Sequence, residues 1–404
     1  MGGVGGIMNM LQVGKPWLLG VCLGFGLWAP SAGLAQQQPI RIGATTALSG
    51  ESSIQGNYSR EGYLLCQKHV NGKGGVLGRQ IEFVLYDDAS NGKTAAALYE
   101  KLIVEDKVDA VLGPYGSAMT EAVADVNEKH RKVMIAPTAG TTSIWEKGRR
   151  YLIMMAAPAE GMTEGLLDLA ARHGLKKIAV IQQEALFANA IIKGALVLAK
   201  EKGLELVFLE TYRASPDDFS DLLNKVRAVK PDVLIAGSIR LVDLHAITRK
   251  MKELDLNVPM VAAVPYGQVS DYYTQLGKDA EFVYSGSFWE PGLTYPGNQE
   301  FVAAYEQEFK HAPSNQSALH YAGCQLLVDA MRRTGGFDSE KLREALLTLK
   351  TKTVAGDFAV DGRGYQIAHQ FVTSQWQDGE KIVVWPDAVA TGKARLPTPV
   401  WSKR

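Results

Sequence analysis

A regular alternation of short apolar runs and longer amphipathic segments limits what this chain can fold into. The first apolar run, residues 40–45, is followed by a helical pattern at residues 59–70. The other predicted strands of the first half are residues 81–86, 108–112, 133–136 and 151–155. Strands that alternate with helices indicate parallel sheets with helices on both faces. The sequence therefore predicts an α/β fold built from doubly wound parallel sheets.

Two segments rich in small residues and proline interrupt this alternation. The first is AAPAEGM at residues 156–162, after which a second set of strand–helix units runs from residue 178 to residue 285. The second is FWEPGLTYPGN at residues 288–298, followed by three helical patterns and then short predicted strands. We interpret both segments as crossings between two lobes of ordinary domain size.

Two predicted strands of the first half end in loops of glycine, proline and hydroxyl residues. These are VLGPYGS at residues 111–117 and IAPTAGT at residues 135–141. Ser117 is the predicted N-cap of a helix over residues 118–129, and a helix N-terminus at a strand end suits an anion. Ligands of open α/β sheets bind beyond the carboxyl ends of the strands. The simpler alternative is that Ser117 only caps its own helix.

The first 35 residues have the form of a secretory signal peptide. Lys15 precedes an apolar run at residues 16–28, and small residues follow at residues 31–35, where we expect cleavage. No later apolar run approaches the length of a membrane-spanning helix. We therefore expect a mature protein that begins at residue 36 and is exported.

Charge and cysteine content narrow the possible partners. Lysine plus arginine and aspartate plus glutamate number 43 each in the 404 residues, without a long block of one sign, which argues against a nucleic-acid partner. The mature chain has only Cys66 and Cys324, each inside an apolar helical pattern. A disulfide stays open, but small buried hydrophobic residues are the expectation.

The sequence lacks the usual patterns of catalysis and metal binding. The seven histidines have no ligand spacing, and neither a nucleophile elbow nor a phosphate-binding loop follows the signal segment. Asp87 and Asp88 end a predicted strand, where they could hold a metal or accept a phosphoryl group, but a solvated loop is the simpler interpretation. We expect no enzyme activity, no metal site and no cofactor.

Several segments give the chain a family likeness. They are residues 42–50 at the first strand and loop, NGKGGVLGRQIEFVLYDDASN at 71–91, the two loops above, KKIAVI at 176–181, and DFSDLLNKVRAVKPDVLIAG at 218–237. In their order and spacing, the chain resembles the type I periplasmic solute-binding proteins of ABC importers, in the leucine/isoleucine/valine-binding group. The resemblance covers essentially the whole mature chain.

The resemblance implies two lobes joined by a three-crossing hinge, with the ligand in the cleft between them. We expect the third crossing near residues 349–354. The implied N-terminal lobe comprises residues 36–157 and 289–350, the C-terminal lobe residues 158–288 and 351–390, and residues 391–404 form a tail. The implied partners are a small-molecule ligand and an ABC transporter permease that recognises the closed form, and we expect a monomer.

The resemblance also implies where the ligand binds. Amino-acid-binding relatives hold the ligand carboxylate with a serine after the third strand, which matches Ser117, and with the loop after the fourth strand. Gly140 stands where relatives often have a threonine, and Thr141 could substitute for it. The predicted ligand contacts are Gln55, Tyr115, Gly116, Ser117, Thr138, Ala139, Gly140, Thr141, Phe187, Ile239, Arg240, Val264, Tyr266 and Trp289.

The other end of the implied site departs from the family pattern. Where relatives place a tyrosine and an acidic residue for the ligand ammonium, this chain has Phe187 and Val264. A buried ammonium without such partners is unfavourable, although Glu184 or Glu290 could compensate. The leading expectation is a branched-chain or other apolar amino acid. The alternatives are aromatic or aliphatic carboxylates without an amine, and a ligand sensor of the same fold.

Overall fold

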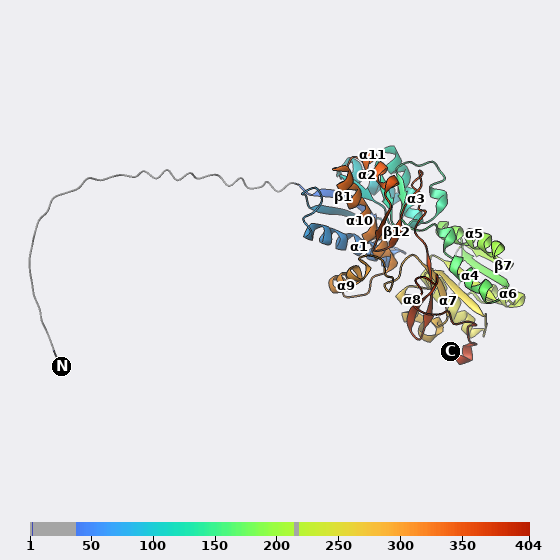
Figure 1. The fold of residues 1–404 in the computed structure, drawn as a ribbon. Coiled ribbons are helices and arrows are strands. Elements are labelled where there is room, and N and C mark those ends of the chain that lie inside the picture. The colour runs from blue at the N-terminus through green and yellow to red at the C-terminus, as the bar shows by residue number, and fades with distance from the viewer. Residues whose placement is uncertain (1, 3–37, 214–217) are drawn as a thin grey trace, which may run out of the picture. The chain divides into compact units, whose positions relative to one another are not determined.

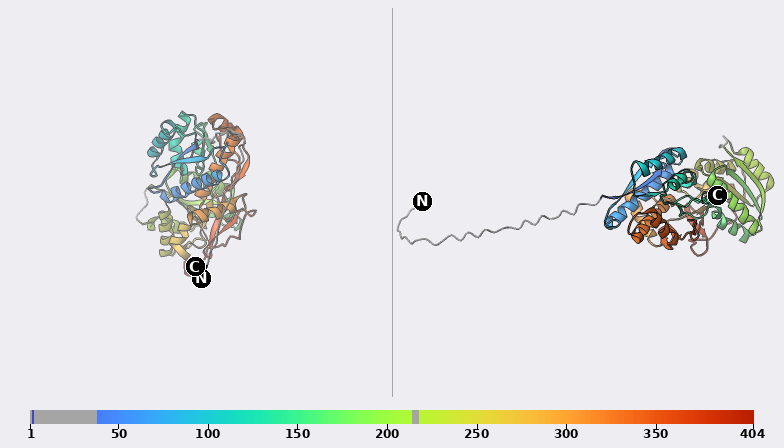
Figure 2. Two further views of the ribbon diagram at one scale, coloured as in Figure 1. Left: turned by 90° about the vertical axis from the view of Figure 1, so that its left-hand side faces the viewer. Right: turned by 90° about the horizontal axis from the view of Figure 1, so that it is seen from above.

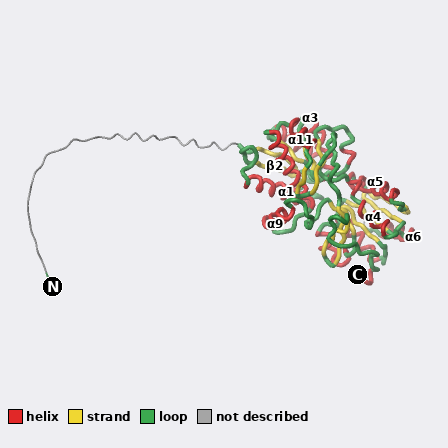
Figure 3. The backbone as a smooth tube through the Cα atoms, viewed as in Figure 1, coloured by secondary structure: helices red, strands yellow, loops and turns green. Residues whose placement is uncertain are grey.

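A computed structural model describes Gly2, residues 38–213 and residues 218–404 of the chain. The predicted signal peptide and its cleavage site therefore lie outside the described residues, except for Gly2. Residues 38–404 form one compact unit. Within this unit the strands gather into two groups, each accompanied by helices (Figure 3).

The first lobe is built on a parallel sheet of five strands in the order β2-β1-β3-β4-β5. The strands are β1 (Ile40–Thr46), β2 (Ile81–Asp87), β3 (Ala110–Leu112), β4 (Met134–Ala136) and β5 (Leu152–Met154). The helices that follow the first three are α1 (Ser53–Gly72), α2 (Gly92–Val104) and α3 (Gly116–Lys129). Because helices cover the sheet, strand residues such as Ile42 and Leu112 are fully buried, which explains the continuous apolar runs.

The second lobe is built on a sheet of seven strands in the order β14-β13-β10-β9-β8-β6-β7. Its parallel strands are β6 (Lys177–Gln183), β7 (Glu205–Tyr212), β8 (Val233–Ser238), β9 (Met260–Pro265) and β10 (Tyr284–Ser287). Its helices are α4 (Glu164–Arg172), α5 (Leu186–Glu201), α6 (Ser220–Val229), α7 (Leu241–Glu253) and α8 (Ser270–Leu276). The predicted α/β fold with two parallel-sheet lobes is confirmed.

Two antiparallel strands extend the second sheet at one edge. They are β13 (Val372–Gln377), which pairs with β10, and β14 (Glu380–Trp385), which pairs with β13. The turn between them has positive φ angles at Asp378 and Gly379, 54° and 87°. Both are needed for a tight two-residue hairpin turn, a conformation that an Asp-Gly pair adopts readily.

The chain passes between the two sheets three times. It leaves the first sheet after β5, and after β10 it returns to the first lobe with α9 (Asn298–Phe309), α10 (Asn315–Thr334) and α11 (Ser339–Thr348). After a small hairpin of β11 (Thr351–Thr353) and β12 (Gly356–Phe358) it enters the second sheet at β13. The predicted crossings fall in these three intervals, while the residue-level lobe boundaries stay a prediction. Short 3-10 helices occur at Thr142–Ile144, Ala159–Gly161, Gly277–Ala280 and Trp401–Lys403.

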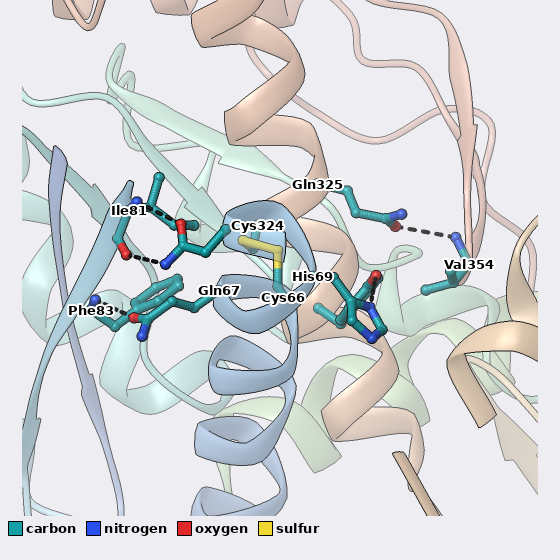
Figure 4. Close-up of a disulfide and its surroundings, with 10 residues drawn as sticks. Cys66, Gln67, His69, Ile81, Phe83, Cys324, Gln325 and Val354 are labelled. Carbon is teal, nitrogen blue, oxygen red and sulfur yellow. Dashed lines mark hydrogen bonds between the residues drawn. A yellow bond between two sulfur atoms is a disulfide. The ribbon is translucent and has the colours of Figure 1, made fainter. Parts of the chain in front are cut away.

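Helix α10 lies against α1 although more than half of the chain separates them in sequence (Figures 1 and 2). A disulfide joins Cys66 of α1 to Cys324 of α10, with a Cα–Cα distance of 6.3 Å (Figure 4). Both residues are buried, as predicted, but the expectation that they are unpaired is wrong. No local sequence pattern predicts that these two helix faces meet, because their contact depends on the return of the chain to the first lobe.

One further expectation is corrected, and the C-terminal tail can be placed. Helix α1 begins at Ser53 rather than near residue 59, so Gln55 lies in its first turn and not in a loop. The tail packs on the second lobe: the Thr398 N–H donates to the Pro259 carbonyl at 2.7 Å, and the Trp401 indole donates to the Leu256 carbonyl at 2.8 Å. None of the helices among the described residues combines the length and apolarity of a membrane span.

Removing the disulfide should destabilise the fold without changing it. A Cys66→Ala/Cys324→Ala variant is expected to lose about 2–5 kcal/mol of unfolding free energy, because the cross-link restricts the unfolded chain between distant residues. Urea denaturation of the variant and of the wild type, with and without reductant, measures this difference. Reductant should lower the stability of the wild type alone; equal stability of both proteins would show that the bond contributes nothing.

Candidate functional site

A cavity of about 270 Å³ lies where the strand ends of the two lobes approach each other. Loops after β1, β2, β3 and β4 form one wall, and loops after β6, β8 and β9 form the other. This is the expected place, since parallel strands end at one edge of a sheet. The predicted residues that line the cavity are Tyr115, Gly116, Ser117, Thr138, Phe187, Ile239 and Tyr266.

The hydroxyl of Ser117 is held by the loop after β4. Its Oγ accepts hydrogen bonds from Oγ1 of Thr141 at 2.9 Å and from the Thr141 N–H at 3.3 Å. An oxygen that accepts two hydrogen bonds keeps its own proton available. Ser117 has no acceptor among the described residues, so its O–H is free to donate to a bound molecule.

A second hydrogen bond ties the same two loops. The Gly116 N–H donates to Oγ1 of Thr138 at 2.9 Å, at a position where φ is +80° and glycine is favoured. Thr138 thereby also keeps its proton as a donor at the cavity wall. The two loops singled out in the sequence therefore act as one unit.

The predicted role of Ser117 as a helix cap is wrong. The N-cap of α3 is Tyr115, and Ser117 is the second residue of the helix, where its side chain makes no capping hydrogen bond. The N–H groups of the first helical turn have no acceptor within the helix. The Gly116 N–H goes to Thr138, which leaves those of Ser117 and Ala118 at the cavity wall. Two hydroxyl and two N–H donors thus converge in one place, near the positive end of the α3 dipole.

The opposite wall is apolar and aromatic. The rings of Phe187 and Phe288 stack with centroids 6.2 Å apart, and Phe288 packs on Phe371 at 4.6 Å. Ile239 and Met162 also line the cavity. The cavity therefore has a donor-rich end in the first lobe and an apolar end that faces it.

A hydrogen bond between two tyrosines links the lobes beside the cavity. The hydroxyls of Tyr115, from the first lobe, and Tyr266, from the second, are hydrogen-bonded. Burial raises the pKa of Tyr266 to about 12 and that of Tyr115 well above its usual value, so both are neutral at physiological pH. Each offers the cavity an aromatic surface and no charge.

Three predicted residues lie behind the cavity wall. Thr141 orients Ser117, and Ala139 belongs to the core of the first lobe. Gly140 packs so closely that a Cβ there would come within 2.7 Å of the Ala157 carbonyl and 3.3 Å of the Phe187 ring. A threonine therefore cannot fit at Gly140 in this arrangement, and Thr141 bonds to Ser117 instead.

Four predicted residues lie away from this cavity. Val264 is buried in the core, and the Trp289 indole donates to Asn298 and to the Val354 carbonyl, packing between two crossings. Gln55 and Arg240 line an adjoining hollow of about 580 Å³, where Arg240 Nε lies 3.7 Å from Asp243 Oδ1. Their contact with a ligand stays a prediction.

Sequence reasoning chose Gln55 from the region after the first strand and missed the residues of that loop that line the cavity. Glu51, Ser52 and Ser90 line the cavity, as do Asn315 and Gln316 at the start of α10. The one sequence feature that could have indicated this loop is Asp87, because its carboxylate binds the loop; its position after a strand suggested only a metal site or a solvated loop. No local sequence pattern indicates that the start of α10 lines the cavity, because it is brought there by tertiary packing.

Asp87 fixes the first loop by hydrogen bonds. Its Oδ1 accepts from the N–H groups of Leu48 at 2.9 Å, Ser49 at 3.2 Å and Ala89 at 2.8 Å, and its Oδ2 accepts from the Ser49 hydroxyl at 2.7 Å. Burial alone would raise the pKa of Asp87, but these hydrogen bonds lower it, so the carboxylate stays ionised. In the part of the chain that the structure describes, no group of three or more metal-ligating side chains occurs.

The chain is similar to known proteins over most of its length. Residues 39–381 match the family described as periplasmic binding protein. Leu/Ile/Val-binding protein homolog 7 of Brucella suis is 25% identical over 377 residues, covering 89% of this chain and 94% of its own. The leucine-, isoleucine-, valine-, threonine- and alanine-binding protein of Pseudomonas aeruginosa is 24% identical over 344 residues, covering 83% and 90%.

Solved structures share the fold. The leucine-binding protein LivK of Thermotoga maritima superimposes with a TM-score of 0.77 at 22% identity, covering 85% of this chain and 97% of its own. A solute-binding protein of an ABC transporter from Rhodopseudomonas palustris, solved in complex with 3,4-dihydroxybenzoic acid, superimposes with a TM-score of 0.75 at 22% identity. The match covers 91% of this chain and 99% of that protein.

The family match over most of the chain, together with the shared two-lobed fold, identifies a substrate-binding protein rather than an enzyme. The chain belongs to the periplasmic binding protein family. It has the fold of the type I substrate-binding proteins that serve ABC transporters, and its curated relatives include Leu/Ile/Val-binding proteins.

The histidine behind the aromatic wall should make stability depend on pH. His369 Nε2 lies 2.9 Å from the Phe288 carbonyl, and burial lowers the pKa of His369 to about 4, against 6.5 for a free histidine. Between these pH values only the unfolded chain binds the proton, so stability falls as pH falls, by up to about 3 kcal/mol from pH 7 to pH 4.

Urea denaturation across this pH range measures the effect. A His369→Gln variant keeps an N–H near the Phe288 carbonyl but does not titrate, so its stability should fall less steeply with decreasing pH. Carboxylates and the other histidines contribute equally to the pH dependence of stability in both proteins, so the difference between the two profiles reports on His369. Parallel pH profiles would contradict the assignment to His369.

Proposed function

We propose that this protein binds a small apolar molecule that bears a carboxylate, and delivers it to an ABC import permease. The leading ligand class is a branched-chain or other apolar amino acid. The observation that carries this proposal is the convergence of the Ser117 and Thr138 hydroxyls with two free N–H groups of α3, opposite an aromatic wall. Donors without accepting neighbours are suited to a carboxylate, which only accepts.

The size of the cavity favours a small ligand. Its volume of about 270 Å³ lies just below the range of roughly 300–1,000 Å³ usual for drug-sized ligands. A free amino acid or a small aromatic acid suits that volume better than a peptide. The names of relatives point the same way, since one binds leucine and related amino acids, and another was solved with an aromatic acid.

A second candidate is an aromatic or aliphatic carboxylate without an amine. It is favoured by Val264, which stands where an acidic residue would hold an ammonium, and by the rings of Tyr115, Phe187, Tyr266 and Phe288. The apolar end of the cavity accepts either side chain, so the two candidates differ only in the amine.

We further propose that the protein works in the periplasm as a monomer. Export rests on the signal-like residues 1–35, and the location agrees with the family. Ligand contacts from both lobes would stabilise the closed arrangement, which is the form that a permease is expected to recognise.

Thermal denaturation of refolded, ligand-free protein tests the ligand class. Leucine, isoleucine, valine, phenylalanine, 4-methylpentanoate and benzoate form a first panel. A ligand present at a thousandfold excess over its Kd should raise stability by about 4 kcal/mol. If no small carboxylate shifts the transition, the proposed function is wrong.

The Ser117→Ala variant tests the carboxylate site. Loss of one donor to a charged group should weaken binding by about 1–3 kcal/mol while leaving the fold intact. Titration calorimetry measures the change, with Ser220→Ala at the start of α6 as a matched control that should bind like the wild type. Unchanged affinity in Ser117→Ala would remove Ser117 from the site.

A further inference from the structure

Glu51 is the only charged side chain in the cavity wall among the described residues. It has no ion-pair partner in the part of the chain that the structure describes, and its side chain is exposed. A lone carboxylate beside a site for another carboxylate is unfavourable unless a positive charge lies between them. Glu51 also lines the adjoining hollow with Arg240 and Arg249, but no ion pair joins it to either among the described residues. A cationic group of the ligand beside Glu51 would replace the repulsion between the two carboxylates with attraction.

The two other acids considered as partners for an ammonium group, Glu184 and Glu290, already form ion pairs. Glu184 is bound by Arg213 at 2.6 Å and does not line the cavity. Glu290 is bound by Lys381 at 2.6 Å and lies in a neighbouring hollow. With Val264 in the core, no acid of the second lobe among the described residues faces the cavity.

The loop that carries Glu51 is fixed by close packing and hydrogen bonds on both sides of this residue. On one side, Gly50 has φ of +82°, and a Cβ there would come within 2.6 Å of the Ala89 carbonyl. On the other side, the Ser52 N–H donates to Ser90 Oγ at 3.0 Å, and the Ser90 hydroxyl donates to the Ser49 carbonyl at 2.9 Å. Helix α1 begins at Ser53, so Glu51 lies just before the positive end of the helix dipole.

Two neutral groups accompany Glu51 in the wall. Tyr266 lies close enough for the charge of Glu51 to contribute to its raised pKa, after burial, so its ring adjoins the same place. Asn315 is 7% exposed and lines the cavity, and its Oδ1 has no partner among the described residues. A π face and an unpaired acceptor both suit an ammonium group.

We infer that Glu51 of the first lobe binds the ammonium group of the ligand, so that the protein selects amino acids over the corresponding acids without an amine. The inference rests on the proposed carboxylate site at Ser117. A zwitterion satisfies both charges of the site, whereas an amine-free carboxylate leaves Glu51 unpaired near a second negative charge.

Titration calorimetry with two matched ligand pairs tests the inference. The pairs are leucine with 4-methylpentanoate, and phenylalanine with 3-phenylpropanoate, which differ only in the amine. The proteins are the wild type, Glu51→Gln, the conservative Glu51→Asp, and Glu184→Gln as a control acid outside the cavity.

The wild type should bind the better amino acid at least about tenfold more tightly than its amine-free partner. Glu51→Gln should lower the affinity for the amino acid about tenfold or more, and should leave the affinity for the amine-free acid unchanged or higher. Glu51→Asp should retain part of the preference, and Glu184→Gln all of it. A fall in affinity for both members of a pair would indicate a structural role and overturn the inference.

The remaining outcomes separate the inference from the proposed function. Equal binding within a pair, a preference for the amine-free acid, or an unaltered Glu51→Gln would overturn the role of Glu51 but leave the carboxylate site standing. If the wild type binds none of the four compounds and Ser117→Ala changes nothing in the wider panel, the proposed function fails and the inference fails with it.

Discussion

The hydrogen bonds between the loops after β3 and β4 are the interaction on which the site depends. Thr141 donates twice to Ser117, and Gly116 donates to Thr138. Through these bonds each loop orients the hydroxyl of the other, so that both protons are left for a ligand. The arrangement needs no buried positive charge, since neutral donors and a helix dipole can stabilise a carboxylate without the desolvation cost of an arginine.

The second lobe contributes mainly apolar and aromatic surface to the cavity, and few polar groups. Its aromatic wall, formed by Phe187 with Phe288 from the crossing, faces the donors of the first lobe. The hydrogen bond between Tyr115 and Tyr266 joins the lobes next to the cavity, and both tyrosines stay neutral. Ligand contacts with both lobes can therefore be polar at one end and apolar at the other, which fits a molecule with a charged head and an apolar side chain.

The first lobe also depends on contacts between distant parts of the chain. The disulfide fixes α10 on α1, and the start of α10 brings Asn315 and Gln316 to the cavity (Figure 4). The loop that carries Glu51 is set by Asp87 and Ser90, at the end of the neighbouring strand. The aspartates after β2, which suggested a metal or a solvated loop, thus organise the wall of the binding site.

The sequence by itself determined the strand–helix alternation, the crossings and the two donor loops, because these features are local patterns of apolarity, glycine and hydroxyl residues. It could not determine the pairing of Cys66 with Cys324, the start of α1, or the exclusion of Val264 and Trp289 from the cavity. These depend on how helices and crossings pack after the chain has folded back on itself. The placement of Glu51 as the charged residue of the wall was likewise decided by tertiary structure, because hydrogen bonds from another strand end fix its loop.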